Sequence, residues 1–389
     1  MEKDIIIVGA GAAGLSLACS LSNTNLKILL IEKQPIENII NPEYDGREIA
    51  LTHFSKKILT ELNIWKRFPA NQISLIKEAK VLDGNSPYAL HFDRKKVSSD
   101  ALGYLVSNHI IRKALYEEII TKKNIEIISN SSVSKIKTNE KSATIKLNNK
   151  EIKSQLIVAA DSRFSKARTE MGISASLQDF GRVAIVCKMN LSKNHHNIAY
   201  ECFRYGETLA LLPLVNNSAS IVMTVPYQNS EKIMKLKNDE FNNFITNKFN
   251  NKFGKMKLSK KRHHYSLVGV YADKFVSNRF ALIGDAAVGM HPVTAHGYNL
   301  GLRGQNTLYK HIQNALLNGL DYSSSIILEK YQSNHRKDSK ALYLGTNAIV
   351  KLYTDDSSIS KILRKTVLRI GNNISPFKKQ IINQLTEIN

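Results

Sequence analysis

Three short runs of glycines and acids, far apart in the sequence, contain the residues that could bind a ligand. The first is Gly9-Ala10-Gly11-Ala12-Ala13-Gly14, followed at some distance by Glu32-Lys33; the second begins at Asp161 and the third at Gly284-Asp285. Glycines allow backbone N–H groups to approach a phosphate closely, and a carboxylate can accept hydrogen bonds from sugar hydroxyls. This combination of residue types indicates a nucleotide-binding site.

The first run lies inside a complete strand–helix–strand unit. Ile5 to Val8 is a β-branched apolar run that predicts a buried parallel strand, residues 15–21 predict a helix, and Ile28 to Ile31 predict a second strand that ends at Glu32. We expect the glycines to form the turn, to admit a pyrophosphate at the helix N-terminus and to let the helix pack on the strand. The alternative is a glycine-rich loop in an ordinary α/β fold. Glu32 does not choose between NAD and FAD, because both contain an adenosine ribose.

Asp161 and Arg47 are further candidates with two interpretations each. Asp161 follows an apolar run, and the carboxyl ends of strands in open α/β sheets face the ligand. It could also cap the helix that follows, and the two roles are compatible. Arg47 comes after Asp45-Gly46, so it could reach a phosphate or the edge of a cofactor ring, or it could form an ion pair with a nearby acid. The sequence alone leaves both interpretations of Arg47 open.

The third run distinguishes between the cofactors. A predicted strand over residues 279–283 ends at Gly284-Asp285, and a loop containing Pro292 and Gly297 leads into a long helix near Asn299-Leu300. Asp285 would accept a hydrogen bond from a ribityl hydroxyl, and the helix N-terminus would face the pyrimidine edge of a flavin, where negative charge collects on reduction. A nicotinamide enzyme has no use for that arrangement, so the sequence favours FAD.

Composition indicates a folded protein of 389 residues, of which 43% are hydrophobic, and the length suits two intimately joined domains. The three cysteines are too few and too scattered for a disulfide framework or a metal site, so we expect them to be reduced core residues. The first strand leaves no room for a signal peptide, and no apolar run approaches the length of a membrane span. We therefore expect a cytoplasmic protein.

The charge balance is strongly basic, with 55 Lys and Arg against 33 Asp and Glu and a net charge of +22. Nucleic acid, an anionic membrane face and a lysine-rich composition would each explain it. The basic residues are spread along the chain, and no recognised nucleic-acid motif accompanies them. We therefore expect no nucleic-acid partner, while membrane attraction and composition both stay open.

The order of predicted elements indicates an α/β fold with an interleaved second domain. Residues 73–93 and 174–270 show the alternation of an antiparallel sheet, interrupted by one amphipathic helix at about 231–249. A β-meander is predicted from residues 125–128, 132–137, 143–147 and 152–158. The predicted domains are a nucleotide-binding domain (1–72, 94–173 and 271–320), a substrate domain (73–93 and 174–270) and a C-terminal helical region (321–389).

The three runs, in this order and spacing, resemble the class A flavoprotein monooxygenases, single-component aromatic hydroxylases related to para-hydroxybenzoate hydroxylase. The resemblance covers nearly the whole chain. Residues 45–51, 209–214 and 284–303 look like the ubiquinone-biosynthesis hydroxylases UbiH, UbiF and UbiI, and the loop from His291 to Gly297 is similar to the UbiM branch. The chain departs from the family pattern at Ser162 (usually Gly), Val288-Gly289 (usually His-Thr) and Ala295-His296 (usually Gly-Gln).

The resemblance implies a fold and an activity. The fold would be a Rossmann-like FAD-binding domain of the GR2/para-hydroxybenzoate hydroxylase type, with an interleaved antiparallel-sheet substrate domain and C-terminal helices. The activity would use NAD(P)H and O₂, through a C4a-hydroperoxyflavin, to hydroxylate the aromatic ring of a polyprenyl phenol or quinol in ubiquinone biosynthesis. By the same resemblance, Asp161 would contact flavin and NAD(P)H, Arg47 would hold the flavin in its mobile positions, and Arg112 would help bind FAD.

Two histidines are candidates for a general base, which is optional because a quinol ring is already activated. They are His291 and His296, and a structural role for both in a Pro/Gly loop is the alternative. A polyprenyl substrate would place the protein on the inner face of the cytoplasmic membrane, with other ubiquinone-biosynthesis proteins as partners. The sequence leaves a homo-oligomer open.

Rival functions fit the same fold. A flavin-dependent prenyl-chain reductase would consume no oxygen. A flavin halogenase is disfavoured because Trp65 is the only tryptophan, which excludes that group's paired-tryptophan motif. A non-catalytic prenyl-binding protein would gain nothing from the Asp285 cluster.

Overall fold

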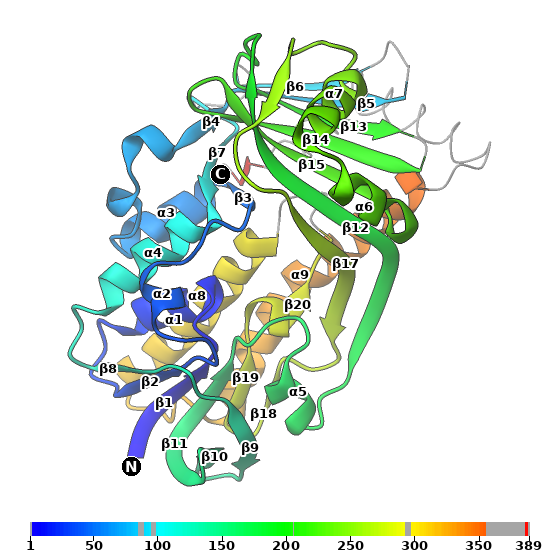
Figure 1. Cartoon of the computed structure of the whole chain (residues 1–389). Coiled ribbons are helices and arrows are strands. Elements are labelled where there is room, and N and C mark those ends of the chain that lie inside the picture. Colours follow the sequence, from blue (N-terminus) through cyan, green and yellow to red (C-terminus); the bar gives the residue numbers. More distant parts are fainter. Residues whose placement is uncertain are drawn as a thin grey trace.

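The computed structural model describes residues 2–84, 89–94, 99–204, 206–291, 297–354 and 386–387. Figure 1 shows two main sheets, with helices packed on both. The helices are α1 (Ala12–Leu21), α2 (Glu37–Ile40), α3 (His53–Glu61), α4 (Asn108–Ile119), α5 (Lys166–Glu170), α6 (Tyr227–Lys235), α7 (Asn238–Lys248), α8 (Gly297–Leu317) and α9 (Ser325–Thr354).

The first main sheet contains the predicted nucleotide-binding unit. Its path follows the order β18 (Val276–Ser277), β19 (Phe280–Leu282), β11 (Lys150–Ala159), β1 (Glu2–Val8), β2 (Ile28–Ile31) and β8 (Ile125–Ile128). The five strands from β19 to β8 are parallel to one another, and β18 pairs antiparallel with β19. Ile31, Val8, Ala159 and Leu282 lie in one row across four of these strands. The segments that begin after this row therefore meet at one edge of the sheet.

The second main sheet is almost wholly antiparallel and stands above the first in Figure 1. Its path is β20 (Val288–Gly289), β17 (His263–Ala272), β12 (Ala175–Leu191), β15 (Ser218–Pro226), β14 (Glu207–Leu214), β13 (Ile198–Arg204), β5 (Glu78–Asp83) and β6 (Ala89–Asp93), with β16 (Met256–Leu258) on β12. Among the described strands of this sheet, only β13 and β5 pair in parallel. Because β5 and β6 come from an early part of the chain, the predicted interleaved sheet is confirmed.

A small third sheet links the two, in the order β3 (Glu48–Leu51), β7 (Gly103–Ser107) and β4 (Ser74–Ile76). Its strand β4 lies within the range 73–93 but pairs with β7 rather than with the second sheet. The domain boundaries drawn from the sequence stay a prediction. Residues 355–385 of the expected C-terminal helical region lie outside the described residues.

Two sequence predictions about secondary structure are wrong. The helix expected over residues 231–249 is two helices, because Leu236 adopts an extended ψ of 138° and Glu240 accepts a hydrogen bond from the Lys237 N–H at 2.9 Å, which starts a new helix. The meander does not include residues 125–128, because β8 pairs in parallel with β2. The antiparallel set consists of β9 (Val133–Thr138), β10 (Ala143–Leu147) and β11.

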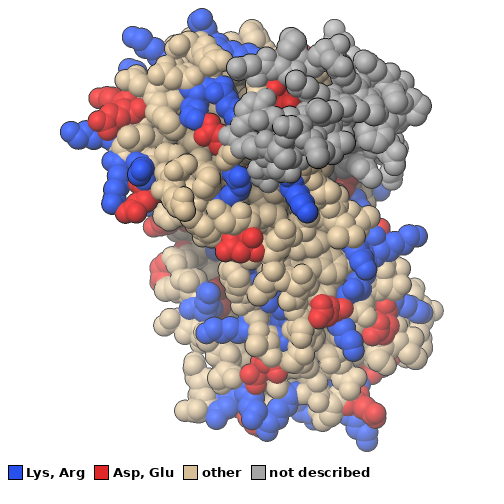
Figure 2. All heavy atoms as spheres, turned by 90° about the vertical axis from the view of Figure 1, so that its right-hand side faces the viewer, with Lys and Arg blue, Asp and Glu red and all other residues tan. Residues whose placement is uncertain are grey.

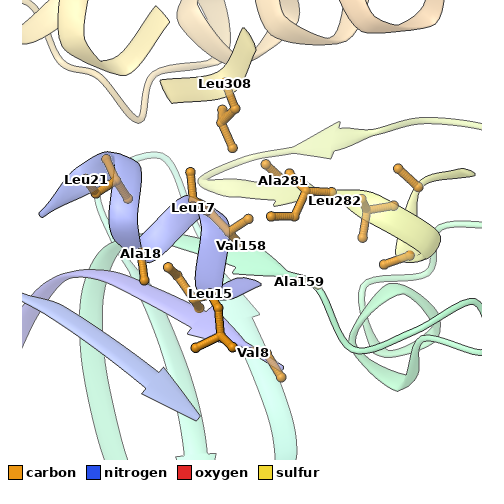
Figure 3. Close-up of a cluster of buried hydrophobic side chains, with 14 of the residues drawn as sticks. Val8, Leu15, Leu17, Ala18, Leu21, Val158, Ala159, Ala281, Leu282 and Leu308 are labelled. Atoms are coloured by element: carbon orange, nitrogen blue, oxygen red, sulfur yellow. The ribbon is translucent and has the colours of Figure 1, made fainter. Parts of the chain in front are cut away.

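The core around α1 holds the first sheet against the helices, as Figure 3 shows for Val8, Leu15, Val158, Leu282 and Leu308. All five are buried to 9% exposure or less. Helix α1 is apolar on nearly every side because it contacts α4 and α8 as well as the sheet. Burying one large aliphatic side chain contributes about 1.5–3 kcal/mol. This packing fixes the position of the glycine loop that precedes α1.

The cysteines and the surface charges bear on the composition predictions. Cys19, Cys187 and Cys202 are buried free thiols, as expected. On the face shown in Figure 2, Lys and Arg side chains are dispersed among acidic and uncharged residues rather than gathered in one cluster. Among the helices of the described residues, none is both long enough and apolar enough to cross a membrane.

Candidate active site

Two of the three glycines in the loop after β1 are surrounded closely by other atoms, which leave no room for a side chain. Gly9 has φ +107°, and a Cβ there would lie 2.5 Å from the Ala160 carbonyl oxygen; a Cβ on Gly14 would lie 1.9 Å from the Gly9 carbonyl oxygen. A Cβ on Gly11 would meet no atom of the described residues within 4 Å. Two glycines are therefore needed for packing, and the third leaves open space where a pyrophosphate could approach the backbone.

Glu32 already holds this loop from the neighbouring strand. Its Oε2 accepts a hydrogen bond from the Ala10 N–H at 2.7 Å, and its Oε1 accepts one from the Gln34 N–H at 3.0 Å. A carboxylate has about four acceptor sites, so it can also accept from ribose hydroxyls. The Lys33 side chain next to it is exposed.

Arg47 and Arg112 form a basic pair beside the glycine loop. Arg47 is half exposed and forms an ion pair with Asp45, with 2.5 Å between Nη2 and Oδ2. Arg112 donates to the Asn38 carbonyl at 3.0 Å, while its buried Nε has no hydrogen-bond partner among the described residues. Burial and then the charge of Arg47 lower the pKa of Arg112. A phosphate would satisfy the Nε donor and relieve the repulsion between the two cations.

Asp161 supports the start of the helix α5 that follows it. Its Oδ2 accepts from the Ala167 N–H at 3.1 Å and its Oδ1 from the hydroxyl of Ser165 at 2.5 Å, so Asp161 supports the first turn of α5, whose N-cap residue is Ser165. The Cα of Asp161 lies 3.0 Å from the position of a Cβ on Gly9, which places this residue directly against the glycine loop. Its contact with flavin or NAD(P)H stays a prediction.

Asp285 lies at the start of the third run and is 38% exposed. Its Oδ2 accepts from Nη2 of Arg163 at 3.0 Å. A Cβ on Gly284 would lie 2.7 Å from the Cβ of Ala13, so the first and third runs are in contact. Asp285 is also close enough to act electrostatically on Arg47. The carboxylate therefore faces the same region as the basic pair.

Helix α8 begins beside these residues. Gly297 is its first residue, and a Cβ there would meet no atom of the described residues within 4 Å. Asn299 is buried; its Nδ2 donates to the Ala50 carbonyl at 2.8 Å and its Oδ1 accepts from the Thr52 N–H at 3.3 Å, which ties α8 to β3. Leu300 is buried in the core. The structure thus supplies a helix N-terminus at the place where a flavin ring is expected.

Of the two histidines considered as a general base, the structure describes only His291. His291 is buried with its ring 4.8 Å from that of Phe180, and burial together with the charges of Arg182 and Arg163 lowers its pKa to about 4. A base with so low a pKa takes up little proton at neutral pH, which favours the structural alternative. His296 and Pro292 lie outside the described residues.

Other residues of the site were not identified from the sequence. Arg163 pairs with Asp285, and the buried Arg168 joins the second run to the third by donating to the carbonyls of Arg163 and Ala286 at 3.1 and 2.9 Å. Both arginines follow Asp161 closely in the sequence, and this proximity could have identified them as residues of the site. The hydroxyl of Tyr265 donates to the Asp45 carbonyl at 2.5 Å. No local sequence pattern could have predicted this contact, because the two residues are more than 200 positions apart.

These residues fit a bound FAD. The open space at Gly11, the unpartnered Nε of Arg112 and the partly exposed Asp285 would serve a pyrophosphate and a ribityl chain, and the start of α8 would face the ring. The fold and the site together define a flavin-dependent oxidoreductase of the α/β class. Comparison with known proteins supports this class and narrows it.

A family model described as "FAD binding domain" matches residues 2–343. Among curated relatives, the ubiquinone hydroxylase UbiM of Neisseria meningitidis is 44% identical over 99% of this chain and 85% of its own length. The ubiquinone hydroxylase UbiL of Rhodospirillum rubrum is 27% identical over 97% of this chain and 87% of its own length. The chain belongs to this FAD-binding family and, within it, to the group of ubiquinone hydroxylases.

Solved structures show the same fold. p-Nitrophenol 4-monooxygenase PnpA from Pseudomonas putida DLL-E4 superposes with a TM-score of 0.80 at 14% identity, covering 99% of both chains. PqsL of P. aeruginosa superposes with a TM-score of 0.78 at 16% identity, covering 94% of this chain and all of PqsL. The predicted fold class, with its para-hydroxybenzoate hydroxylase-like architecture, is confirmed.

Proposed function

We propose that this protein is an FAD-dependent monooxygenase that hydroxylates the aromatic ring of a polyprenyl phenol or quinol in ubiquinone biosynthesis, using NAD(P)H and O₂. The observation that carries the proposal is the single row of strand ends at Ile31, Val8, Ala159 and Leu282. It gathers Glu32, the glycine loop, Asp161 and Asp285 at one sheet edge, and two of the curated relatives are named ubiquinone hydroxylases.

The chain's own residues would hold and orient the cofactor. Glu32 would bind the adenosine ribose, the loop at Gly11 and the guanidinium of Arg112 would bind the pyrophosphate, and Asp285 would bind the ribityl chain. The N-terminus of α8 would favour negative charge on the pyrimidine edge of the ring. Bound FAD supplies the electron transfer from NAD(P)H and the activation of O₂. Arg47 would stabilise whichever phosphate or ring edge approaches the Asp45 loop.

The second sheet would cover the ring and exclude water. On its inner face, Leu214 belongs to an apolar cluster that also includes Leu105 of the third sheet, and Val186 and Leu267 belong to a second apolar cluster. Apolar walls of this kind suit an aromatic ring with a hydrocarbon tail, and they limit the unproductive loss of peroxide.

We extend the proposal to the membrane surface and to partners. The net charge of +22 would attract the protein to an anionic membrane face, where a polyprenyl substrate resides. Leu317, Leu320 and Ile326, which are 55–81% exposed around the turn between α8 and α9, would contribute apolar contacts. Other ubiquinone-biosynthesis proteins are the expected partners at that surface.

The purified protein tests the proposed function. We expect a yellow protein with a flavin absorption spectrum whose NAD(P)H oxidation and oxygen uptake rise when a short-chain demethoxyubiquinol analogue is added, with formation of the hydroxylated ring. The analogue lacking a free ring hydroxyl serves as the control. A colourless preparation that FAD does not reconstitute would overturn the proposal, and NAD(P)H oxidation with reduction of a prenyl chain but no oxygen uptake would establish the reductase instead.

A further inference from the structure

Glu201 on β13 points to the inner face of the second sheet. Its neighbours Tyr200 and Cys202 belong to the apolar cluster that packs against α7 on the outer face, together with Phe241 and Ile245 of that helix. Successive side chains of a strand point to opposite faces, so Glu201 faces away from α7. It therefore projects toward the region between this sheet and the nucleotide-binding edge.

A row of small and apolar residues runs from Glu201 across the sheet toward the cofactor region. Glu201 pairs with Ala210, Ala210 with Val222, and Val222 with Val186. A Cβ on Gly46 would lie 3.4 Å from Cγ1 of Val186, so the row ends beneath the loop that carries Arg47. The carboxyl group of Glu201 therefore lies on the face of the sheet that the Asp45–Arg47 loop contacts.

The apolar residues on this face form two separate clusters rather than one. The first contains Leu214 and is joined by Val81, the neighbour of Glu201 on β5, and it packs against Leu105 of the third sheet. The second contains Val186 and Leu267. The row of Glu201 and Ala210 lies between the two clusters. A flat ring placed over the small Ala210 would contact apolar walls on both sides.

The carboxyl group of Glu201 has no structural partner among the described residues. Within the described residues, no hydrogen bond or ion pair is made by its carboxyl group, although its side chain is only partly accessible. Burial alone raises its pKa to about 8. A second polar group on the same face, the hydroxyl of Ser220, is fully buried and also has no partner among the described residues. A buried polar group without a partner is costly, so the Ser220 hydroxyl is expected to have a ligand, and the partly accessible carboxyl group of Glu201 lies on the same face within reach of a bound molecule.

We propose that Glu201 binds a ring hydroxyl of the aromatic substrate and makes the site selective for neutral hydroxylated rings over rings that carry a carboxylate. The inference rests on the proposed function and names the substrate class of that same site. A protonated carboxyl group can both donate to and accept from a phenolic hydroxyl. As the pH rises through about 8, the Glu201 carboxyl group ionises, and a carboxylate on the ring would then meet a like charge in a water-poor site, where two like charges repel strongly.

Two variants of the full-length, FAD-loaded protein test this role, with Glu78→Gln as the matched control. Glu78 is a carboxylate on a strand of the same sheet, but it is partly exposed and bonded to His91. The probes are a short-chain demethoxyubiquinol analogue and 4-hydroxybenzoate, and the readouts are the Kd from calorimetry, kcat and KM, and the share of oxygen released as peroxide.

We expect Glu201→Leu to raise the Kd and the KM of the quinol analogue about tenfold, because the ring hydroxyl loses its partner. Glu201→Gln should change these values much less, since the amide still forms hydrogen bonds. For 4-hydroxybenzoate, wild-type binding should weaken further as the pH rises through 8, and this pH dependence should disappear in Glu201→Gln. Glu78→Gln should match the wild type in every measurement.

Wild-type values of Kd, KM and pH dependence in both Glu201 variants would overturn the inference. Should Glu201→Leu fail to fold or to retain flavin, the pH dependence of 4-hydroxybenzoate binding in Glu201→Gln decides alone. Failure of the proposed function would look different, because the wild-type protein itself would then bind no FAD or show no ring-stimulated oxygen uptake.

Discussion

The nucleotide-binding edge and the inner face of the second sheet build their sites in different ways. At the edge, backbone atoms define the site: Gly9 and Gly14 leave no room for a Cβ, and the row from Ile31 to Leu282 aligns the segments. On the inner face, side chains such as Glu201 define the site on strands that would tolerate many other residues. A site made by the backbone constrains residue types strongly, whereas a site made by side chains can change with the substrate.

The most severe test of this comparison substitutes two glycines of the same loop. In Gly14→Ala the new Cβ would overlap the Gly9 carbonyl, so we expect a loss of about 3 kcal/mol or more in unfolding free energy. In Gly11→Ala the new Cβ enters open space, and stability should change by no more than about 0.5 kcal/mol while FAD binds more weakly. Urea unfolding and flavin titration measure both effects.

Equal destabilisation by the two alanines would contradict the division of the loop into packing and ligand-facing glycines. A Gly11→Ala variant with wild-type FAD affinity would place the pyrophosphate elsewhere.

The next test removes the carboxylate of the third run. Asp285→Ala should give a folded protein that binds FAD about 10- to 100-fold more weakly, because a charged hydrogen bond contributes about 1.5–3 kcal/mol. The ion pair with Arg163 is too exposed to add more than about 1 kcal/mol to stability. Flavin absorbance after gel filtration reports the loss, and Asp273→Ala, which changes an exposed carboxylate, is the control. Retained flavin with full turnover would remove Asp285 from the site.

His291 tests the junction between the two regions, because it contacts Phe180 of the second sheet and feels the charge of Arg163. Its pKa is lowered to about 4 in the folded protein, so the unfolded chain binds the proton more readily and stability is lost as the pH falls below about 6.5. Between pH 7 and 5 this loss is about 2 kcal/mol.

The comparison variant is His291→Asn, which has no titrating ring. Its unfolding free energy should fall by about 2 kcal/mol less than that of the wild type over this pH range. Chemical denaturation at the two pH values measures the difference. Identical pH dependence in the two proteins would show that His291 is not buried in its neutral form.

The sequence predicted the nucleotide-binding edge well because its signals are local. Apolar runs ending in glycine or acid specify both a strand and its carboxyl end, and the order of runs then places Glu32, Asp161 and Asp285 together. The prediction that residues 125–128 belong to the meander was wrong because the partner of a strand is set by contacts with residues distant in sequence. The helix break at Leu236 was missed because the amphipathic pattern continues across it.

The inner face could not be predicted from local signals. Glu201 alternates with Tyr200 and Cys202, a pattern that usually indicates a solvent-exposed acid on a surface strand. Only the packing of α7 on the opposite face shows that the acid points inward. The neutral state of His291 likewise depends on tertiary neighbours, because the residues that bury and surround it are distant in sequence.

The smallest expected effect concerns Ser162, a residue at the nucleotide-binding edge whose backbone conformation favours glycine. Ser162 has φ +94°, a conformation that favours glycine, and its side chain is exposed without a hydrogen bond among the described residues. Holding a non-glycine residue there costs about 1–3 kcal/mol, and the added flexibility of a glycine in the unfolded chain offsets about 0.5–1 kcal/mol of the relief. Ser162→Gly should therefore stabilise the protein by about 1 kcal/mol, measured by urea unfolding. Ser176→Gly, which introduces the same residue within the extended strand β12, should instead destabilise it, and a Ser162→Gly variant no more stable than the wild type would mean that the Asp161 turn relaxes without strain.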